Sequence, residues 1–321
     1  MYVTDKLLDL RIQRRHDEAD GIISIELVSC DGGLLPAFEA GAHINVHVGP
    51  GLVRQYSLCN DPAERHRYRL AVLLEKNGRG GSAALHSNFL EGRIVQTSLP
   101  QNNFRLVEDA GHSVLLAGGI GITPLLSMAF RLHGLGRSFE LHYLSRSPRR
   151  AAFLAEFANI GFAHHIRIYH DESPAAERFD LAAALPSPIS GAHVYLCGPQ
   201  GFMDAITRSL RADDWADHHV HQEHFSTNVD KTGDRFLVTA KRSGRTVSVE
   251  SGQTIARALS DVGIEVLLSC EEGICGTCLL DVIEGVPDHR DIYQTEAQKA
   301  TNRRITPCCS RALSPVLVLD I

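Results

Sequence analysis

The chain lacks the features that would direct it to a membrane, to secretion or to nucleic acid. Its longest apolar run, residues 114–130, contains three glycines and a proline and is too short to span a bilayer. Residues 1–20 are charged throughout, with no apolar core of a signal peptide. The net charge of −6 is mild and argues against a nucleic-acid partner. The chain also contains no repeats or low-complexity tracts. We expect a cytoplasmic protein of two or three globular domains that makes no membrane contact.

Eight cysteines in 321 residues do not make a small disulfide scaffold, and four of them follow a metal-ligand pattern. Cys270, Cys275 and Cys278 are spaced C-x4-C-x2-C, and Cys308 follows after a long gap, as in plant-type two-iron two-sulfur proteins. Zinc and bare thiols are the alternatives, but zinc sites commonly use two C-x2-4-C pairs. Cys309 competes for the fourth position, and the gap from Cys278 favours Cys308. We therefore predict a two-iron two-sulfur cluster, in a protein that resides in a reducing compartment.

Residues 1–106 carry the pattern of short strands separated by glycine-rich turns. The alternating or apolar segments lie at 23–27, 44–48 and 69–74. Such a series predicts a small antiparallel β-barrel. One helical pattern, residues 82–90, follows two glycines, with Ser82 expected at the N-cap.

Residues 107–225 alternate between strand and helix patterns. The strand patterns lie at 114–117, 140–144, 166–169, 194–197 and 220–224, and the helical ones at 125–133, 151–159, 180–185 and 202–211. This alternation predicts a doubly wound, parallel α/β sheet.

Residues 226–234 are polar and predict a linker. Beyond them, residues 235–321 predict a compact α+β domain: a hairpin at 236–250, a helix at 255–262, the cysteine loop, and strands at 279–283 and 316–321. One helix on a mixed sheet would form an adequate cage for the cluster.

Two glycine turns carry the nucleotide-binding signal. The segment Gly118-Gly119-Ile-Gly121-Ile-Thr123-Pro124 joins a strand to a helix, so its backbone can approach a pyrophosphate at the helix N-terminus. Pro124 replaces the third glycine of G-x-G-x-x-G, which leaves a purely structural turn as the alternative.

The second turn, Cys197-Gly198-Pro199, follows another strand at the carboxyl edge of the same predicted sheet, where ligands of open α/β sheets bind. We expect Cys197 near a nicotinamide, and a buried cysteine at a strand end is the alternative.

A candidate anion site lies in the predicted barrel. Its residues are Arg54, Tyr56 and Ser57, followed by Arg79, Gly80, Gly81 and Ser82. A guanidinium, a glycine turn and a hydroxyl at a helix start suit a phosphate, and the tyrosine offers a face for a flat ring. Each residue alone is equally well explained as an ordinary surface residue.

Taken together, these motifs resemble the ferredoxin–NADP reductase superfamily, and within it the phthalate dioxygenase reductase branch, over essentially the whole chain. Arg54, Tyr56 and Ser57 match its R-x-Y-S flavin motif, and the two glycine turns match its nucleotide motifs. Residues 51–68 resemble vanillate demethylase reductase components in particular. The branch's D-H-R-D and C-x-S-R-A motifs appear at residues 288–291 and 308–312.

The resemblance implies three domains: a flavin-binding barrel, a nucleotide-binding α/β domain and a C-terminal β-grasp ferredoxin. It implies FMN rather than FAD, with Gly80, Gly81 and Ser82 near the FMN phosphate. It also places Phe225 against the flavin ring, whereas an isolated Phe225 would be interpreted as capping an apolar edge.

The choice of nicotinamide coenzyme depends on two residues after neighbouring strands. Arg146 favours the 2′-phosphate of NADPH, whereas Asp171 could meet the adenosine ribose of NADH. We expect NADH, which the resembled branch commonly uses. Histidines at 164–165 and 218–221 look metal-like, but without other ligands nearby we expect solvated residues.

The predicted protein is a monomeric oxidoreductase. Hydride would pass from NADH to FMN beside Ser57 and Thr123, with no general acid or base required of the protein. The cluster would then pass single electrons to a terminal Rieske-type oxygenase. A reductase for a non-oxygenase partner and a redox sensor are the alternatives.

Overall fold

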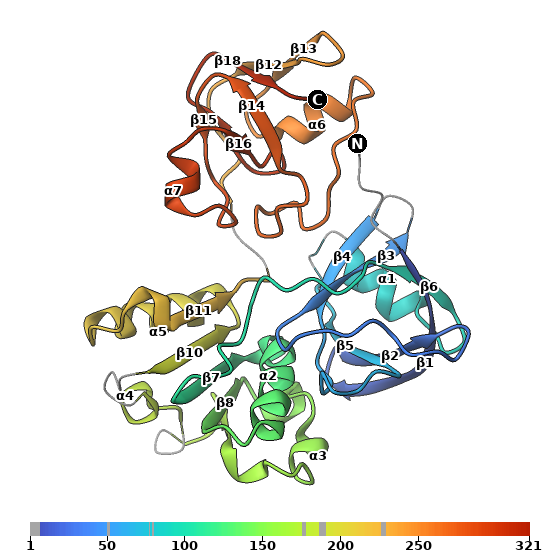
Figure 1. Ribbon diagram of the computed structural model, residues 1–321, viewed down its shortest axis with the longest axis vertical. Coiled ribbons are helices and arrows are strands. Elements are labelled where there is room, and N and C mark those ends of the chain that lie inside the picture. Colours follow the sequence, from blue (N-terminus) through green and yellow to red (C-terminus); the bar gives the residue numbers. More distant parts are fainter. Residues whose placement is uncertain are drawn as a thin grey trace. The chain divides into compact units, whose positions relative to one another are not determined.

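The computed structural model describes residues 7–49, 52–76, 78, 80–174, 178–185, 191–225 and 229–321. The chain divides into two compact units, residues 1–224 and 225–321 (Figure 1). Arg79 of the candidate anion site and residues 226–228 of the predicted linker lie outside the described residues. The predicted boundary near residue 106 falls within the first unit and stays a prediction.

The first unit begins with a six-stranded antiparallel sheet in the order β4-β3-β6-β1-β2-β5. Its elements are β1 (Leu8–Ala19), β2 (Ile22–Ser29), β3 (His43–Gly49), β4 (Leu52–Ser57), β5 (Tyr68–Leu73), α1 (Gly81–Asn88) and β6 (Ile94–Thr97). The predicted strands are confirmed. The sequence did not predict β1, because only Leu10 and Ile12 of this charged segment are fully buried.

Helix α1 begins one residue earlier than predicted. Gly80 occupies the N-cap with φ of 82°, a left-handed conformation that glycine adopts without steric cost. Ser82 therefore lies inside the first turn, where its hydroxyl accepts a hydrogen bond from the Glu75 N–H at 3.0 Å. The prediction of Ser82 as the N-cap is wrong.

The second sheet of this unit is entirely parallel, in the order β11-β10-β7-β8-β9, as predicted. Its strands are β7 (His112–Gly118), β8 (Phe139–Ser145), β9 (Ile166–His170), β10 (Ala192–Cys197) and β11 (Val220–Glu223). The helices are α2 (Ile122–Gly134), α3 (Leu154–Phe157), α4 (Leu181–Ala184) and α5 (Gln200–Ala212), with 3-10 turns η1 (Gly119–Gly121), η2 (Pro148–Arg150), η3 (Ala163–His165) and η5 (Asp217–His219).

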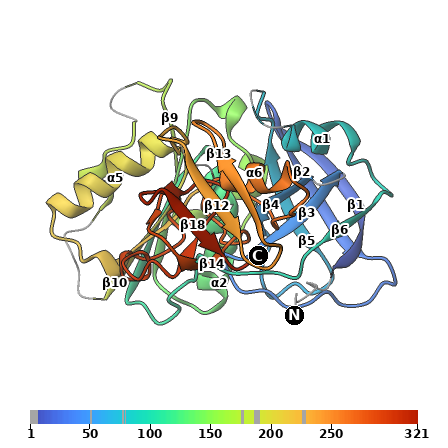
Figure 2. The ribbon, with the colours of Figure 1, turned by 90° about the horizontal axis from the view of Figure 1, so that it is seen from above.

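Alternate residues of β7 enter different hydrophobic cores, since successive side chains of a strand point to opposite faces. Leu115 and Ala117 pack with α2, whereas Val114 and Leu116 pack with α5. Helices α2 and α5 therefore cover opposite faces of the sheet (Figure 1, Figure 2). This double covering explains why β7 is a continuous apolar run.

The second unit is a mixed five-stranded sheet with one main helix, as predicted. Its elements are β12 (Phe236–Ala240), β13 (Arg245–Val249), α6 (Ile255–Ser260), β14 (Leu280–Glu284), β15 (Pro287–Asp288), α7 (Glu296–Lys299), β16 (Arg304–Ile305), β17 (Arg311–Ala312) and β18 (Val316–Leu319). Strands β15 and β17 form a separate antiparallel pair. Among the described residues, no helix combines the length and the apolar character needed to cross a membrane.

Candidate functional site

The two glycine turns lie in direct contact at the carboxyl ends of β7 and β10. Gly121 approaches the Cys197 carbonyl so closely that a Cβ at this position would overlap it. Gly118 packs in the same way against Gly198 and Pro199. The missing side chains are thus required by the packing of the two turns at the edge where a dinucleotide would bind.

The start of α2 follows directly from the first turn. Gly119 has φ of 55° and open space where a Cβ would stand, and Pro124 lies in the first helical turn, where no N–H donor is needed. The buried Thr123 hydroxyl donates to the Ile120 carbonyl at 3.0 Å. This bond supports a role for Thr123 in shaping the turn, and its predicted place beside the flavin stays a prediction.

A carboxylate that the sequence did not single out joins the barrel to this edge. Glu223 ends β11 and pairs in register with Cys197 on β10. The buried Ser57 hydroxyl, at the end of β4, donates to Glu223 Oε2 at 3.2 Å. Ser57, Cys197 and Glu223 therefore converge from three distant parts of the sequence.

Burial keeps the acidic groups of this trio largely protonated. Desolvation raises the pKa of Glu223 to about 8, although the hydrogen bond from Ser57 opposes part of the shift. Burial also raises the pKa of the Cys197 thiol well above its ordinary value, and the neighbouring Glu223 adds to this. At neutral pH, Glu223 and Cys197 therefore add little negative charge to this edge of the sheet. The only sequence signal for Glu223 is an acid at the carboxyl end of a strand.

The predicted anion site is partly assembled by β4 and α1. The Arg54 side chain packs against Gly81, where a Cβ would overlap it, so the guanidinium stem lies beside the start of the helix. Arg54 Nη1 also donates to the Val53 carbonyl at 2.7 Å. Burial raises the pKa of the nearby Tyr56 phenol, which keeps this ring neutral. A guanidinium at a helix N-terminus is the arrangement that binds phosphate.

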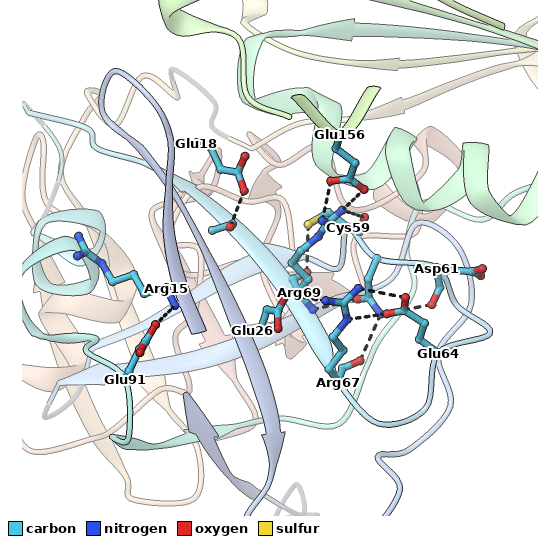
Figure 3. Close-up of polar contacts among 12 residues, drawn as sticks. Arg15, Glu18, Glu26, Cys59, Asp61, Glu64, Arg67, Arg69, Glu91 and Glu156 are labelled. Atoms are coloured by element: carbon cyan, nitrogen blue, oxygen red, sulfur yellow. Dashed lines mark hydrogen bonds and ion pairs between the residues drawn. The ribbon is translucent and has the colours of Figure 1, made fainter. Parts of the chain in front are cut away.

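A largely buried ion pair fastens the barrel to the nucleotide-binding sheet within the first unit. Arg69 of β5 makes a bidentate contact with Glu156 of α3, at 2.7 and 3.0 Å (Figure 3). Its guanidinium also lies 4.9 Å from the centre of the Phe153 ring. Phe153 has φ of 64°, which is uncommon for a non-glycine residue. These contacts hold β5 against α3.

The two candidate residues for coenzyme discrimination, Arg146 and Asp171, lie at the ends of β8 and β9. Arg146 and Asp171 are both exposed, and the Asp171 N–H donates to the Ser145 carbonyl at 3.0 Å. Since both candidates are available at the same edge, the preference for NADH stays a prediction.

The histidine-rich segment lies at the opposite, amino end of the sheet strands. His218 is exposed, as predicted, but the partly buried His221 contacts His193 with 2.8 Å between ring nitrogens. Burial, with help from neighbouring histidines, lowers the pKa of His221 to about 4. The expectation of a solvated residue is therefore wrong for His221.

The cysteine loop of the second unit forms two thiol pairs. Cys270 hydrogen-bonds to Cys275, and this contact lowers the pKa of the Cys275 thiol. Cys278 hydrogen-bonds to Cys308. Two pairs suit two irons with two thiolates each. Among the described residues, no group of three or more His, Cys, Asp or Glu is arranged to hold a metal ion.

Backbone amides in the loop point at the sulfurs. The N–H groups of Glu272 and Ile274 donate to Cys270 Sγ, and that of Thr277 donates to Cys275 Sγ, each at 3.4 Å. Hydrogen bonds to the sulfurs stabilise the thiolate charge and tune the cluster potential. The residues present therefore fit an iron–sulfur cluster.

Cys309 is a further thiol beside the second pair, in side-chain hydrogen-bond contact with Cys308. It is buried, and its sulfur is 3.3 Å from the Thr306 hydroxyl and against Gly273. A Cβ at Gly273, whose φ is 72°, would overlap this sulfur. These contacts favour Cys309 as a packed thiol and Cys308 as the fourth ligand.

Comparisons with known proteins agree with the iron–sulfur site of the second unit and extend over nearly the whole chain. Residues 238–313 match the model of the 2Fe-2S iron-sulfur cluster binding domain. The vanillate O-demethylase oxidoreductase of Pseudomonas sp. (strain HR199 / DSM 7063) is 46% identical over 305 residues, which cover 94% of this chain and 96% of the relative.

Solved structures extend the agreement to the fold. Phthalate dioxygenase reductase, described as a modular structure for electron transfer from pyridine nucleotides to 2Fe-2S, is 40% identical with a TM-score of 0.77 and 98% coverage of both chains. An intact type IV self-sufficient cytochrome P450 monooxygenase gives a TM-score of 0.83 at 36% identity, with 98% of this chain and 41% of that chain covered.

The chain belongs to the phthalate dioxygenase reductase branch of the ferredoxin–NADP reductase superfamily. It is an oxidoreductase with flavin- and nucleotide-binding folds followed by a ferredoxin fold, as the resemblance implied.

Proposed function

We propose that this chain is the reductase component of a Rieske-type aromatic oxygenase or demethylase and carries electrons from NADH through FMN and a two-iron two-sulfur cluster. The observation that carries the proposal is the pairing of two sites in one chain. The first unit has a neutral, buried edge where Ser57 meets Glu223, and the second has two thiol pairs with amides aimed at sulfur.

When bound, FMN accepts a hydride from NADH and releases electrons singly, and the cluster carries single electrons. Arg54, Gly80, Gly81 and Ser82 would hold the FMN phosphate at the start of α1, and Tyr56 would contact its ring. Ser57 would lie beside the reacting edge. Phe225, which follows β11 and exposes 42% of its surface, would cover the ring until NADH displaces it.

The nucleotide would bind along the carboxyl ends of β7, β8 and β10. Gly119, Gly121, Thr123 and Pro124 would form the floor under its pyrophosphate, and Cys197, Gly198 and Pro199 would border the nicotinamide. Arg146 and Asp171 would meet the adenosine ribose. Glu223, protonated at neutral pH, would keep negative charge away from the hydride acceptor.

The cluster ligands would be Cys270, Cys275, Cys278 and Cys308. The relatives' names support an oxygenase as the electron acceptor. We propose a Rieske-type oxygenase, because the 46% identical relative is named for vanillate O-demethylation. The cytochrome P450 that contains a similar module makes a haem oxygenase the second candidate. We also propose that the reductase acts as a monomer, which size-exclusion chromatography tests.

The test combines composition with acceptor choice. Acid extraction should release FMN and about two irons per chain. The purified protein should reduce a purified Rieske-type vanillate demethylase oxygenase with NADH, and should reduce a cytochrome P450 far more slowly. Zinc in place of iron, FAD as the flavin, or equal rates with both oxygenases would contradict the proposal.

A further inference from the structure

Two sequence motifs of the second unit contain arginines that have no role in the chemistry above. They are Asp288-His-Arg290-Asp291, which includes part of β15, and Cys308-x-Ser-Arg311-Ala312, which includes β17. The two short strands pair antiparallel, with Asp288 opposite Arg311. This pairing brings two guanidinium groups to the segment that the sequence predicted to be a loose linker.

Arg311 is surrounded by backbone carbonyls. Its side chain donates to the carbonyls of Lys231, Gly233 and Asp234 in the linker, at 3.0, 3.4 and 2.9 Å. It also donates to the carbonyls of Glu250 and Gln253, at 3.3 and 2.9 Å. Only 2% of the residue is exposed, and its guanidinium lies 5.1 Å from the centre of the Phe236 ring. One buried cation therefore joins the linker to the body of the ferredoxin unit.

Arg290 makes a second attachment to the same segment. Its Nη1 donates to the carbonyls of Asp230 and Thr232, the latter at 2.7 Å. The guanidinium is oriented by Asp288, which accepts from Nε at 2.8 Å and from Nη2 at 2.6 Å. The Asp230 carboxylate in turn accepts from the Thr232 N–H at 2.8 Å, which closes a turn around the attachment.

The attachments change where the linker ends. From Phe225 to Arg235 the chain could reach at most about 34 Å when extended, but from Phe225 to Asp230 only about 17 Å. A predicted linker of nine residues is thus reduced to the few residues before Asp230. For two units joined by a chain, effective concentration falls roughly as the −3/2 power of linker length, so a doubling lowers it about threefold.

We propose that Arg290 and Arg311 are positioning residues that fasten residues 230–234 onto the ferredoxin unit and so set the length of chain across which flavin and cluster exchange electrons. The inference rests on the proposed function, because it assumes that electrons pass from the first unit to the second. The two arginines touch neither the thiol pairs nor the predicted flavin residues among their observed contacts. Their effect is therefore on the linker and not on the cofactors.

The first measurement is digestion of the full-length holoprotein by a lysine-specific endoproteinase. The bond after Lys231 lies within the fastened segment, and Lys76 in the first unit provides an internal reference site. Arg311→Met keeps bulk against Phe236 but removes the donors, and Arg290→Gln removes the second attachment. We expect cleavage after Lys231 to become at least about tenfold faster in Arg311→Met, with a smaller increase in Arg290→Gln.

The second measurement is stopped-flow reduction by NADH, in which flavin and cluster are followed separately. Both variants should bleach the flavin at the wild-type rate and reduce the cluster about threefold more slowly. Inserting five Gly/Ser residues between Val229 and Asp230 of the otherwise unchanged protein should reproduce the same slowing. Arg242→Gln is the matched control, because it removes one positive charge of the same unit, which pairs with both carboxylate oxygens of Asp320.

The outcomes separate this inference from the proposed function. If the wild-type protein never reduces its cluster with NADH, the proposed function fails. If wild-type transfer is normal and both variants keep wild-type cleavage and transfer rates, the fastening role is wrong. If both variants lose the cluster, the arginines support the ferredoxin fold itself and the inference is also overturned. Slower cluster reduction in Arg242→Gln as well would indicate a charge effect and overturn it too.

Discussion

The two units build their chemistry in opposite ways. In the second unit, three of the four candidate ligands stand within nine consecutive residues, and the loop's own amides point at their sulfurs. In the first unit, Ser57, Cys197 and Glu223 come from three strands separated by up to 166 residues. The cluster loop is thus a local structure, whereas the hydride edge exists only once two sheets are packed together. Sequence motifs reveal the first kind of site far better than the second.

The largest expected effect comes from removing the second unit, which carries the cluster loop. A chain truncated after Asp230 keeps the whole first unit and Phe225. It should reduce ferricyanide with NADH at close to the intact rate, since that acceptor takes electrons directly from flavin. It should lose nearly all cytochrome c reduction and all support of an oxygenase. Oxygenase turnover at the intact rate would remove the cluster from the electron path.

The next largest effect tests whether Cys308 or Cys309 is the fourth cluster ligand. Cys308→Ser should lose the cluster, visible as loss of its absorption and of about two irons per chain. Cys309→Ser should keep the cluster, because the Cys309 sulfur packs against Thr306 and Gly273, whereas Cys308 pairs with Cys278. Ferricyanide reduction should persist in both variants. The reverse pattern would move the fourth ligand by one residue.

The assembled site should show its own pH dependence. Because the folded state raises the pKa of Glu223 to about 8, the folded protein binds a proton more tightly than the unfolded chain. The contribution of this group to stability is therefore fully present below the ordinary glutamate pKa and is lost as the pH rises through about 8. Glu223→Gln should flatten this part of the stability profile, measured by thermal unfolding across the pH range.

The same variant tests the role of a neutral side chain at the hydride edge. If only the protonated form is competent, flavin reduction by NADH should fall about tenfold per pH unit above the Glu223 pKa in the wild type. Glu223→Gln should remove this decline. Glu39→Gln, a change of an exposed acid of the barrel, should leave the profile unchanged. A wild-type rate that is constant through pH 10 would contradict the assignment.

The contact between the two sheets of the first unit should matter to hydride transfer but not to the cluster. Arg69→Met or Glu156→Gln leaves a largely buried charge without its partner and should cost about 3 kcal/mol of stability and slow flavin reduction severalfold. The double variant should cost less than the sum of the two. Stopped-flow rates and unfolding free energies in a double-mutant cycle measure this coupling. Strictly additive effects would show that the pair is not a functional contact.

The smallest expected effect concerns coenzyme choice. The wild type should have a higher kcat/KM with NADH than with NADPH. Arg146→Ala should increase this preference a few-fold, because Arg146 is the candidate partner for the 2′-phosphate of NADPH. Asp171→Ala should reduce it by a similar factor. A higher wild-type kcat/KM with NADPH would reverse the assignment.

Much of the architecture was predictable because its signals are periodic or locally spaced. The apolar alternation of β2 and β3, the strand–turn–helix of Gly118–Pro124 and the cysteine spacing all appear in short segments. Strand β1 was missed because its charged residues outnumber the two that are fully buried. Glu223 was missed because its importance comes from burial against Ser57, 166 residues away, and no neighbouring residue signals that contact.

The paired thiols have a practical consequence for handling the protein. Cys270 hydrogen-bonds to Cys275, and Cys278 to Cys308, so each sulfur would have a ready partner for oxidation if iron were lost. Storage in air should therefore close two disulfides, Cys270–Cys275 and Cys278–Cys308, which block iron even though every ligand is present. Reconstitution should fail with iron and sulfide alone and succeed after treatment with a thiol reductant. Material that looks irreversibly damaged would then be an oxidised and recoverable form.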